Sequence, residues 1–289
     1  MKMIKKVFKK LFHHTLSTNY GQHILDTYIN SRIEGKFHRS PENEWLLMNK
    51  NKHLNENCVI LATGPSLAKS DLSLIPENWT IFGVNGIYLA QTRVDYYCYV
   101  SNWWHKNHIP QMNQVNCKRR FIQSDLKDEI GEHQSVETSW YTKILGNEFI
   151  HSIFARSVNI PTGFSTDCSK YIHAGGTVVS ICLQLAYYMG FKKVIITGLD
   201  HSYGVSSVDT KISTSFQVNS EIDHSHFDPK YNAKGINVPV DLKAMEKSYK
   251  LAKRIFEANG RSIINASPIT YLDVFERIAW SKDLFSNNL

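Results

Sequence analysis

The segment GGTVVSICLQLAYYMGFKKVIITGLD, residues 175–200, constrains the fold more than any other part of the chain. Its residues 177–189 are almost wholly apolar and predict a buried helix, which Gly190 is expected to end. Residues 193–197 predict a central strand, and Asp200 follows shortly after it. A buried helix that leads into a buried strand is typical of an α/β protein with a parallel sheet. Because such sheets bind ligands at the carboxyl ends of their strands, Asp200 marks a candidate site.

Four further segments predict strands of the same sheet. They are short and apolar, and helical stretches separate several of them, as in βαβ units. The predicted strands are 59–62, 79–84, 96–100 and 262–267. Residues 240–258 predict an amphipathic helix that Gly260 ends, and 271–278 predict a short final helix. The expected fold class is therefore α/β, a Rossmann-like parallel sheet with helices on both faces.

The length of 289 residues suits one large domain with an appended arm. We expect a single domain over 17–289, with two loop-rich lid segments at about 101–173 and 204–239, where the sequence is polar and weakly periodic. Residues 1–16 are expected to form a separate basic arm. No internal repeat divides the chain further.

The basic arm has the pattern of an amphipathic helix in residues 1–12. Apolar side chains fall on one face and lysines on the other, and such a helix can lie among the headgroups of an anionic membrane. A first helix that docks on the domain, or a disordered arm, is the alternative. The residues expected to contact the membrane are Lys5, Lys6, Phe8, Lys9 and Phe12.

The formal net charge of +7 makes acidic partners plausible, such as phosphates, nucleotides or an anionic membrane. No nucleic-acid partner is expected, because the sequence has no RNA-binding, zinc-finger or basic-zipper signature. The five cysteines are dispersed and include no C-x-x-C pair, which predicts buried thiols in a reducing compartment. We find no signal peptide and no apolar span long enough to cross a bilayer, so the expected location is cytoplasmic.

The turn after the first predicted strand, ATGPSLAKS at residues 62–70, resembles a phosphate loop only superficially. It lacks the second glycine of G-x-x-x-x-G-K-[ST] and also fails G-x-G-x-x-G. Gly64 nevertheless permits close backbone approach, Pro65 rigidifies the turn, and the Ser66 hydroxyl is a candidate phosphate donor. A purely structural turn is the alternative. Asn85 follows the second strand, and two such strand ends in one sheet favour a nucleotide site.

The candidate catalytic side chains are histidines. His201 lies beside Asp200, and His224 and His226 lie in the long polar segment; each could accept a proton from a hydroxyl. The sequence has no D-x-D pair of the kind that holds a divalent metal in many glycosyltransferases, which favours a metal-independent transfer. His224, His226 and Asp228 are a weak metal set without a further clear ligand, and no metal site is predicted.

Five short motifs, in this order, resemble the bacterial sialyltransferases of glycosyltransferase family 42 (Campylobacter type). They also resemble the wider group of motility-associated flagellin glycosyltransferases and 6-hydroxymethylpterin diphosphokinase-like proteins. The resemblance spans about residues 57–278 and implies a variant GT-A-like glycosyltransferase fold, a CMP-activated sugar as donor, inversion at the transferred carbon, and neither a cofactor nor an essential metal. The motifs are GPSL (64–67), FGVNGIYL (82–89), MGFKKVIITGLD (189–200), HFD…DLKAMEKSYKLA (226–252) and NASP (265–268).

The resemblance also implies roles for individual residues. The implied nucleotide or donor contacts are Thr63, where the family has asparagine, Gly64, Pro65, Ser66, Asn85, Ser101 or Asn102, Gly176, Thr177 and Asp200. At two positions, this sequence has a different residue from the one that the family has. The family's arginine before the helix start falls on His173 or Ala174, and its tyrosine falls on Ser202, with Tyr203 as the substitute. The family's base position falls on Asn237, so His226 has to reach the site by another loop geometry, and the identity of the base stays open.

The leading hypothesis is an inverting, metal-independent glycosyltransferase that moves a CMP-activated acidic sugar, sialic acid-like or Kdo, to a bacterial surface glycan or glycolipid. Its expected location is the inner face of the cytoplasmic membrane, where residues 1–12 hold it peripherally, and a second copy of the chain is a candidate partner in a homo-oligomer. One alternative is an ATP-dependent 6-hydroxymethylpterin diphosphokinase-like enzyme. Another is a non-catalytic nucleotide-binding protein at a membrane surface.

Overall fold

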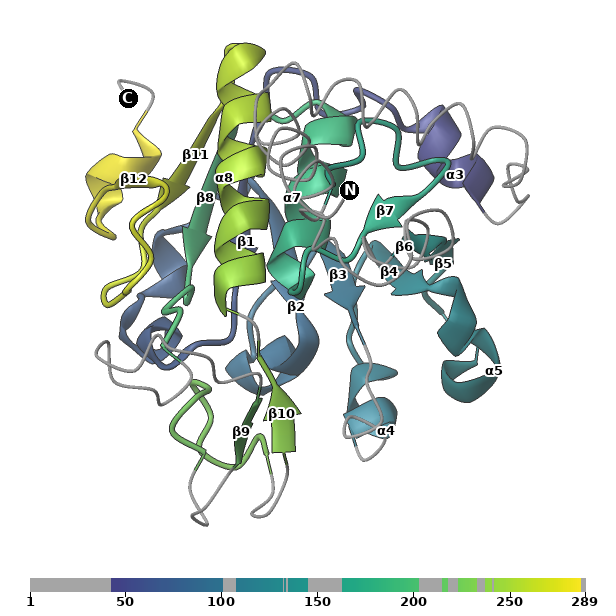
Figure 1. The fold of residues 1–289 in the computed structure, drawn as a ribbon, viewed down its shortest axis with the longest axis horizontal. Helices are drawn as coiled ribbons and strands as arrows, with labels where there is room; N and C mark the ends of the chain where they lie inside the picture. The colour runs from purple at the N-terminus through teal and green to yellow at the C-terminus, as the bar shows by residue number, and fades with distance from the viewer. Residues whose placement is uncertain are drawn as a thin grey trace, which may run out of the picture.

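The fold is built on one parallel sheet of eight strands in the order β12-β11-β8-β1-β2-β3-β4-β5 (Figure 1). The computed structural model describes residues 43–100, 108–131, 133, 135–144, 163–202, 215–217, 223–232, 237–240 and 242–286. The strands of the sheet are β1 (Asn57–Leu61), β2 (Thr80–Val84), β3 (Tyr96–Tyr99), β4 (Arg119–Gln123), β5 (Thr138–Tyr141), β8 (Lys193–Thr197), β11 (Ser262–Asn265) and β12 (Glu276–Arg277). This arrangement confirms the predicted α/β class.

Helical segments connect the strands, and two short strand pairs lie outside the main sheet. The α-helices are α3 (Glu44–Met48), α4 (Ile109–Met112), α5 (Lys127–Ile130), α7 (Val178–Met189) and α8 (Leu242–Ala258). The 3-10 helices are η2 (Pro65–Lys69), η3 (Leu72–Leu74), η4 (Asn85–Ala90), η6 (Ser124–Leu126) and η7 (Lys282–Phe285). The small sheets pair β6 (Lys143–Ile144) with β7 (Ile172–His173), and β9 (Ser215–Gln217) with β10 (Asn237–Pro239).

The central strands are apolar because both faces of the sheet are covered. In β1, Cys58 and Ile60 belong to the core on one face, while Val59 and Leu61 belong to the core on the other. All four side chains are fully buried. Strand β1 lies between β8 and β2, so its apolar run is the centre of both cores.

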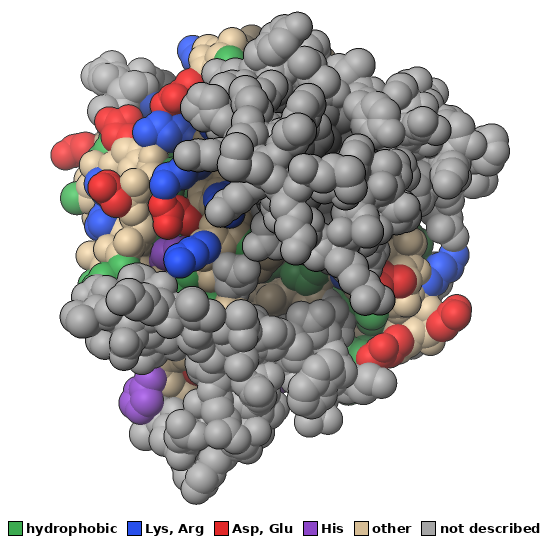
Figure 2. Space-filling view, in the orientation of Figure 1, with side chains coloured by type: hydrophobic (Ala, Val, Ile, Leu, Met, Phe, Trp, Pro, Cys, Tyr) green, Lys and Arg blue, Asp and Glu red, His purple; other side chains and the backbone are tan. Residues whose placement is uncertain are grey.

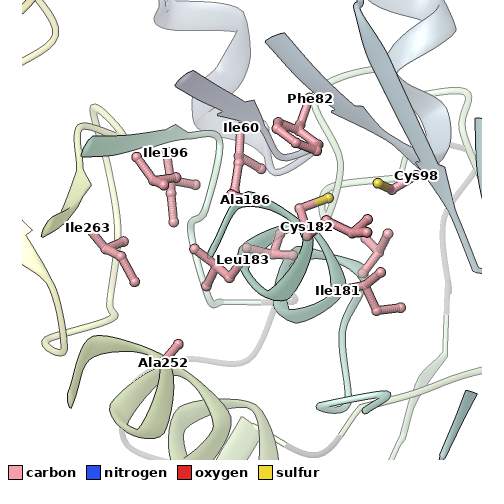
Figure 3. Packing of buried hydrophobic residues seen from close by; sticks show 14 of the residues in the cluster. Ile60, Phe82, Cys98, Ile181, Cys182, Leu183, Ala186, Ile196, Ala252 and Ile263 are labelled. Carbon is pink, nitrogen blue, oxygen red and sulfur yellow. The ribbon is translucent and has the colours of Figure 1, made fainter. Parts of the chain in front are cut away.

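Helix α7 fills the first face, as its sequence predicts. Thr177 caps the amino end by accepting a hydrogen bond from the amide of Val179, and Gly190 ends the helix with a φ of +98°. Cys182, Leu183 and Ala186 of this helix point toward the sheet, and Ala252 of α8 lies beyond it (Figure 3). Helix α7 is therefore apolar all round because it lies between the sheet and α8.

The second face is covered differently. Short 3-10 and α segments cover it, and the turn after β1 contains only the five-residue η2. The apolar side chains that these segments contribute are Leu67, Ile87, Met112, Leu126, Ile130, Leu284 and Phe285. The connections after β1 and β2 are consequently tight, and they keep the carboxyl ends of those strands open to a ligand.

Two sequence expectations are corrected. Segment 101–173 contributes β4 and β5 to the main sheet, so it is not a loop-rich lid throughout. The strand signal of β4 is hidden by two arginines, which are buried because they bond neighbouring groups: Arg119 contacts Ser139 and Glu137, and Arg120 contacts Thr138 and Asn113. Residues 271–278 do not form a helix either, since residues 276–277 pair with β11 as strand β12.

The described surface and core agree with a globular protein. Lys and Arg side chains alternate with Asp and Glu on the described part of the face shown in Figure 2. Four of the five cysteines are buried, Cys117 is half-buried, and all five are free thiols, as predicted. Within the described ranges, no helix combines the length and apolarity needed to cross a membrane.

Candidate functional site

A hollow of about 990 Å³, including its open mouth, lies where the carboxyl ends of β1, β2 and β8 meet the amino end of α7. It is the position at which open α/β sheets bind ligands. Eight predicted site residues line it: Thr63, Gly64, Asn85, Gly176, Thr177, Asp200, His201 and His226. The structure therefore brings together, in one place, residues that are up to 163 positions apart in the sequence.

The floor of the hollow is formed by Thr63, Gly64 and residues 198–200. The amide of Gly64 donates to the carbonyl oxygen of Gly198 at 2.8 Å. A Cβ atom on Gly64 would lie 2.5 Å from that oxygen and 2.9 Å from Cγ of Asp200, distances that no real side chain tolerates. Only glycine allows the two segments to approach this closely.

Ser66 has a different role from the predicted one. Its amide donates to Oδ2 of Asp200 at 2.7 Å, and its hydroxyl donates to Oδ1 of the same carboxylate. Ser66 is buried, and neither it nor Pro65 lines the hollow. The prediction that Ser66 contacts a phosphate is therefore corrected, because its amide and its hydroxyl both donate to Asp200.

Asp200 is a buried carboxylate with a raised pKa. Burial disfavours its charged form and is the main cause, although the hydrogen bonds from Ser66 and the charge of Lys69 act in the opposite direction. The strand end is also fixed from behind, because Leu199 donates to the hydroxyl of Ser267 at 2.8 Å and accepts from Thr270 at 2.6 Å. Asp200 is thus held rigidly in the wall of the hollow.

Asn85 occupies the end of β2 in a left-handed backbone conformation, with a φ of +38°. Its Oδ1 accepts from the amide of Val100 at 3.2 Å, and its carbonyl oxygen accepts from the hydroxyl of Tyr97 at 2.6 Å. Because Oδ1 is engaged, the side-chain NH₂ group is left as the donor for a ligand. Asparagine adopts a positive φ more easily than most residues, which suits it to this turn.

The amino end of α7 forms the opposite wall. Gly175 and Gly176 precede it with φ values of +61° and +74°, and Thr177 is its N-cap. The end of a 12-residue helix carries unpaired amides and partial positive charge, so it favours an anionic group. No lysine or arginine is among the described residues that line the hollow, so among these residues the helix end is the main source of positive potential.

His226 is hydrogen-bonded to a buried carboxylate. Its Nδ1 lies 2.8 Å from Oδ2 of Asp223, whose side chain is almost fully buried. The same carboxylate accepts from the amide of Ser225 and from Nδ2 of Asn232, each at 2.8 Å. Although burial raises the pKa of Asp223, these hydrogen bonds and the nearby His226 lower it overall.

The loop that carries His226, residues 223–232, is anchored to the floor and to the sheet. The amide of Phe227 donates to the carbonyl oxygen of Thr63 at 2.9 Å. The ring of Tyr231 packs against Gly86, where a Cβ would lie 2.5 Å from it, and stacks on His108 with ring centroids 4.7 Å apart. We call residues 223–232 the base loop.

The other predicted histidines are placed less favourably. His201 lines the hollow in a left-handed conformation, and its Nδ1 is buried without a partner among the described residues. Burial lowers its pKa, partly opposed by Glu246, which favours a neutral ring. His224 is exposed and does not line the hollow. In the described part of the chain, no group of three His, Cys, Asp or Glu residues could hold a metal.

Several predicted residues lie outside the described ones: Ser101, Asn102, Tyr203 and the arm residues Lys5, Lys6, Phe8, Lys9 and Phe12. Conversely, the sequence interpretation missed Asp223, Ser225 and Asn232. The available signal was the spacing Asp223-x-x-His226, because an aspartate three residues before a histidine in a tight loop can reach its Nδ1.

Known proteins resemble this chain only distantly. No family model matches the sequence, and no curated protein does. Among solved structures, the sialyltransferase CstII from Campylobacter jejuni in complex with CMP is 14% identical, with a TM-score of 0.42 over 82% of this chain and 89% of that one. CST-II with a trisaccharide acceptor and CMP is 14% identical, with a TM-score of 0.39 over 78% and 86%. The α-2,3-sialyltransferase Cst-I from Campylobacter jejuni is 14% identical, with a TM-score of 0.39 over 79% and 81%.

Proposed function

We propose that the protein is an inverting, metal-independent glycosyltransferase that transfers a CMP-activated acidic sugar to a hydroxyl group of a bacterial surface glycan or glycolipid. One observation carries the proposal: His226, held through Nδ1 by the buried Asp223, lines the same hollow as the amino end of α7. A carboxylate-oriented histidine beside an anion site is suited to deprotonate a nucleophile next to a phosphate leaving group.

The reaction follows from this placement. The acceptor hydroxyl loses its proton to Nε2 of His226, and its oxygen forms a bond to the anomeric carbon of the donor sugar. The bond from that carbon to the phosphate oxygen breaks, and CMP leaves with the electron pair. The amides at the start of α7, together with the NH₂ group of Asn85, are placed to stabilise the negative charge on the departing phosphate.

The rest of the hollow has a binding role. Thr63 and Gly64 are the parts of the floor that face the ligand, and Asp200 supports the same wall. Ser101 or Asn102 would extend the donor site, and Tyr203 would complete the phosphate site. The choice of cytidine and of an acidic sugar rests on the resemblance of the five sequence motifs.

Calorimetry and thermal shift with CMP, CDP, UDP, ADP and ATP, each with and without Mg²⁺, test this function. CMP should stabilise the protein equally well with and without the metal, and a CMP-activated nonulosonic acid should release CMP on incubation with it. Binding that prefers ATP and requires Mg²⁺ would instead indicate phosphoryl transfer and overturn the proposal. CMP binding without turnover of any CMP-activated sugar would indicate a non-catalytic nucleotide-binding protein.

The basic arm supports a second part of the proposal, that the enzyme works at the inner face of the cytoplasmic membrane. On a helical wheel of residues 1–12, the lysines, among them Lys5, Lys6 and Lys9, fill one face, and the apolar side chains, among them Phe8 and Phe12, fill the other. Deleting residues 1–12 should abolish sedimentation with anionic liposomes and leave the melting temperature of the domain unchanged. Equal sedimentation of both proteins would show that the arm is not an anchor.

A further inference from the structure

The base loop contains a second buried polar side chain that lines the same hollow. Asn232 is 3% exposed, and its Oδ1 is buried without a hydrogen-bond partner among the described groups. Leaving a buried acceptor unpaired is unfavourable, so an arrangement that retains one calls for an explanation. A ligand that donates to Oδ1 when it occupies the hollow provides that explanation.

The orientation of the Asn232 amide is fixed by Asp223. Nδ2 of Asn232 lies 2.8 Å from Oδ2 of Asp223. If the amide were turned over, its oxygen would face the carboxylate oxygen, and two acceptors would repel each other. Nδ2 therefore faces Asp223, and Oδ1 is left as the unpaired acceptor of a residue that lines the hollow.

Asp223 fixes the tautomer of His226 by the same logic. Nδ1 lies 2.8 Å from the carboxylate oxygen, a distance that requires a proton between them. In a neutral ring with the proton on Nδ1, Nε2 carries a lone pair and is an acceptor. One buried carboxylate thus makes two adjacent side chains acceptors. The side-chain amide of Asn232 and the ring of His226 are in contact, since Nδ2 of Asn232 is 3.3 Å from Nδ1 of His226.

We infer that Asp223 is a positioning residue that sets both groups, and that Asn232 is a specificity-determining residue whose Oδ1 accepts from a hydroxyl next to the reacting one. Two neighbouring acceptors require a substrate with two neighbouring donors, which a sugar with adjacent free hydroxyls supplies. The first hydroxyl gives its proton to Nε2 of His226, and the second binds Oδ1 of Asn232. The inference about the substrate rests on the proposed glycosyltransferase function, whereas the tautomer of His226 does not.

The tautomer is tested without any turnover. In ¹⁵N-histidine-labelled wild-type protein near pH 8, the ring nitrogens of His226 should show the Nδ1–H form. In Asp223→Asn, whose amide can donate to Nδ1, the proton should move to Nε2, and His224→Ala serves as the control that keeps the wild-type signal of His226. An Nε2–H tautomer in the wild type, or an unchanged tautomer in Asp223→Asn, would overturn the positioning role. If Asp223→Asn does not fold, the wild-type spectrum still decides.

The role of Asn232 is tested with acceptors. For a methyl pyranoside that the wild type uses, removing the hydroxyl adjacent to the reacting one should lower kcat/KM by ~10-fold or more, the effect of one lost hydrogen bond to a buried group. In Asn232→Ala the same removal should have little effect, while CMP binding stays unchanged. An equal loss in both proteins would contradict the assignment. Failure of all acceptors and of CMP release would contradict the proposed function instead, and would leave the result on the tautomer of His226 standing.

Discussion

The floor of the hollow and the base loop each contain one buried aspartate, yet their surroundings shift the pKa values of the two carboxyl groups in opposite directions. Burial raises the pKa of Asp200, although Ser66 bonds both of its oxygens. The pKa of Asp223 is lowered overall, because hydrogen bonds from three neighbours and the nearby histidine exceed the effect of burial. Two aspartates at one site are thus held in opposite electrostatic environments.

The difference lies in how the two regions are built. The floor depends on close backbone contact between residues 63–66 and 198–200, where there is no room for a side chain on Gly64. The base loop depends on hydrogen bonds that close within residues 223–232 and one bond to the floor. Changes in the floor should therefore alter shape and stability, whereas changes in the base loop should alter protonation and rate.

The largest expected effect is on the rate, from His226→Gln. Glutamine retains much of the volume and polarity of histidine but cannot act as a base near neutral pH. The rate of transfer should fall about 10²- to 10⁴-fold, the usual contribution of a general base, and affinity for CMP should stay within a factor of a few. His224→Gln, two residues away and exposed, is the matched control and should be fully active. Equal losses in both variants would show that the loop as a whole was disturbed.

The second effect is on stability, from Gly64→Ala. The new methyl group would meet the carbonyl oxygen of Gly198 and the carboxylate of Asp200, so the two segments must separate. The variant should be destabilised by about 1–3 kcal/mol, the usual cost of overpacking, and should bind CMP less tightly. Urea unfolding and calorimetry measure the two quantities. Gly131→Ala, where nothing lies within 4 Å but φ is +70°, measures the cost of a left-handed backbone alone, a cost that Gly64 does not have because its φ is −67°.

The floor was largely predictable from the sequence, because it follows from local patterns. Apolar strands and small residues at strand ends predict that Gly64 and Asp200 lie at one edge of the sheet, and both line the hollow there; the almost wholly apolar helix does the same for Thr177 in the opposite wall. The base loop was not predictable, because residues 223–232 have no period and their geometry depends on polar contacts. Strand β4 was missed for a related reason: Arg120 reads as exposed in the sequence, and its buried hydrogen bonds are visible only in three dimensions.

A smaller effect is expected from Ser267→Ala, which removes the hydroxyl that accepts from the amide of Leu199. That amide is then buried without a partner, so the stability should fall by about 1–2 kcal/mol. Because Tyr271 and Thr270 still hold the same strand end, the rate of transfer should fall less than tenfold. A large loss of rate without a loss of stability would show that the floor takes a direct part in catalysis.

The smallest effect concerns the pH dependence of stability, and it compares the two aspartates directly. The contribution of Asp200 to the free energy of unfolding should fall as the pH rises from 3.8, the pKa of the unfolded chain, through the raised pKa of the folded state. The reason is that the folded state keeps the proton to a higher pH. The contribution of Asp223 should be present above 3.8 and lost as the pH falls toward its lowered folded pKa, because the unfolded state binds the proton first. Urea unfolding of the wild type, Asp200→Asn and Asp223→Asn between pH 3 and 6 measures both. Burial also lowers the pKa of His173 to about 4, so its protonation in acid reduces the stability of the folded protein. This reduction is the same in all three proteins and cancels when their free energies of unfolding are subtracted. If the stability differences of Asp200→Asn and Asp223→Asn from the wild type changed with pH in the same direction, the two pKa shifts would not have opposite signs, and the comparison would be wrong.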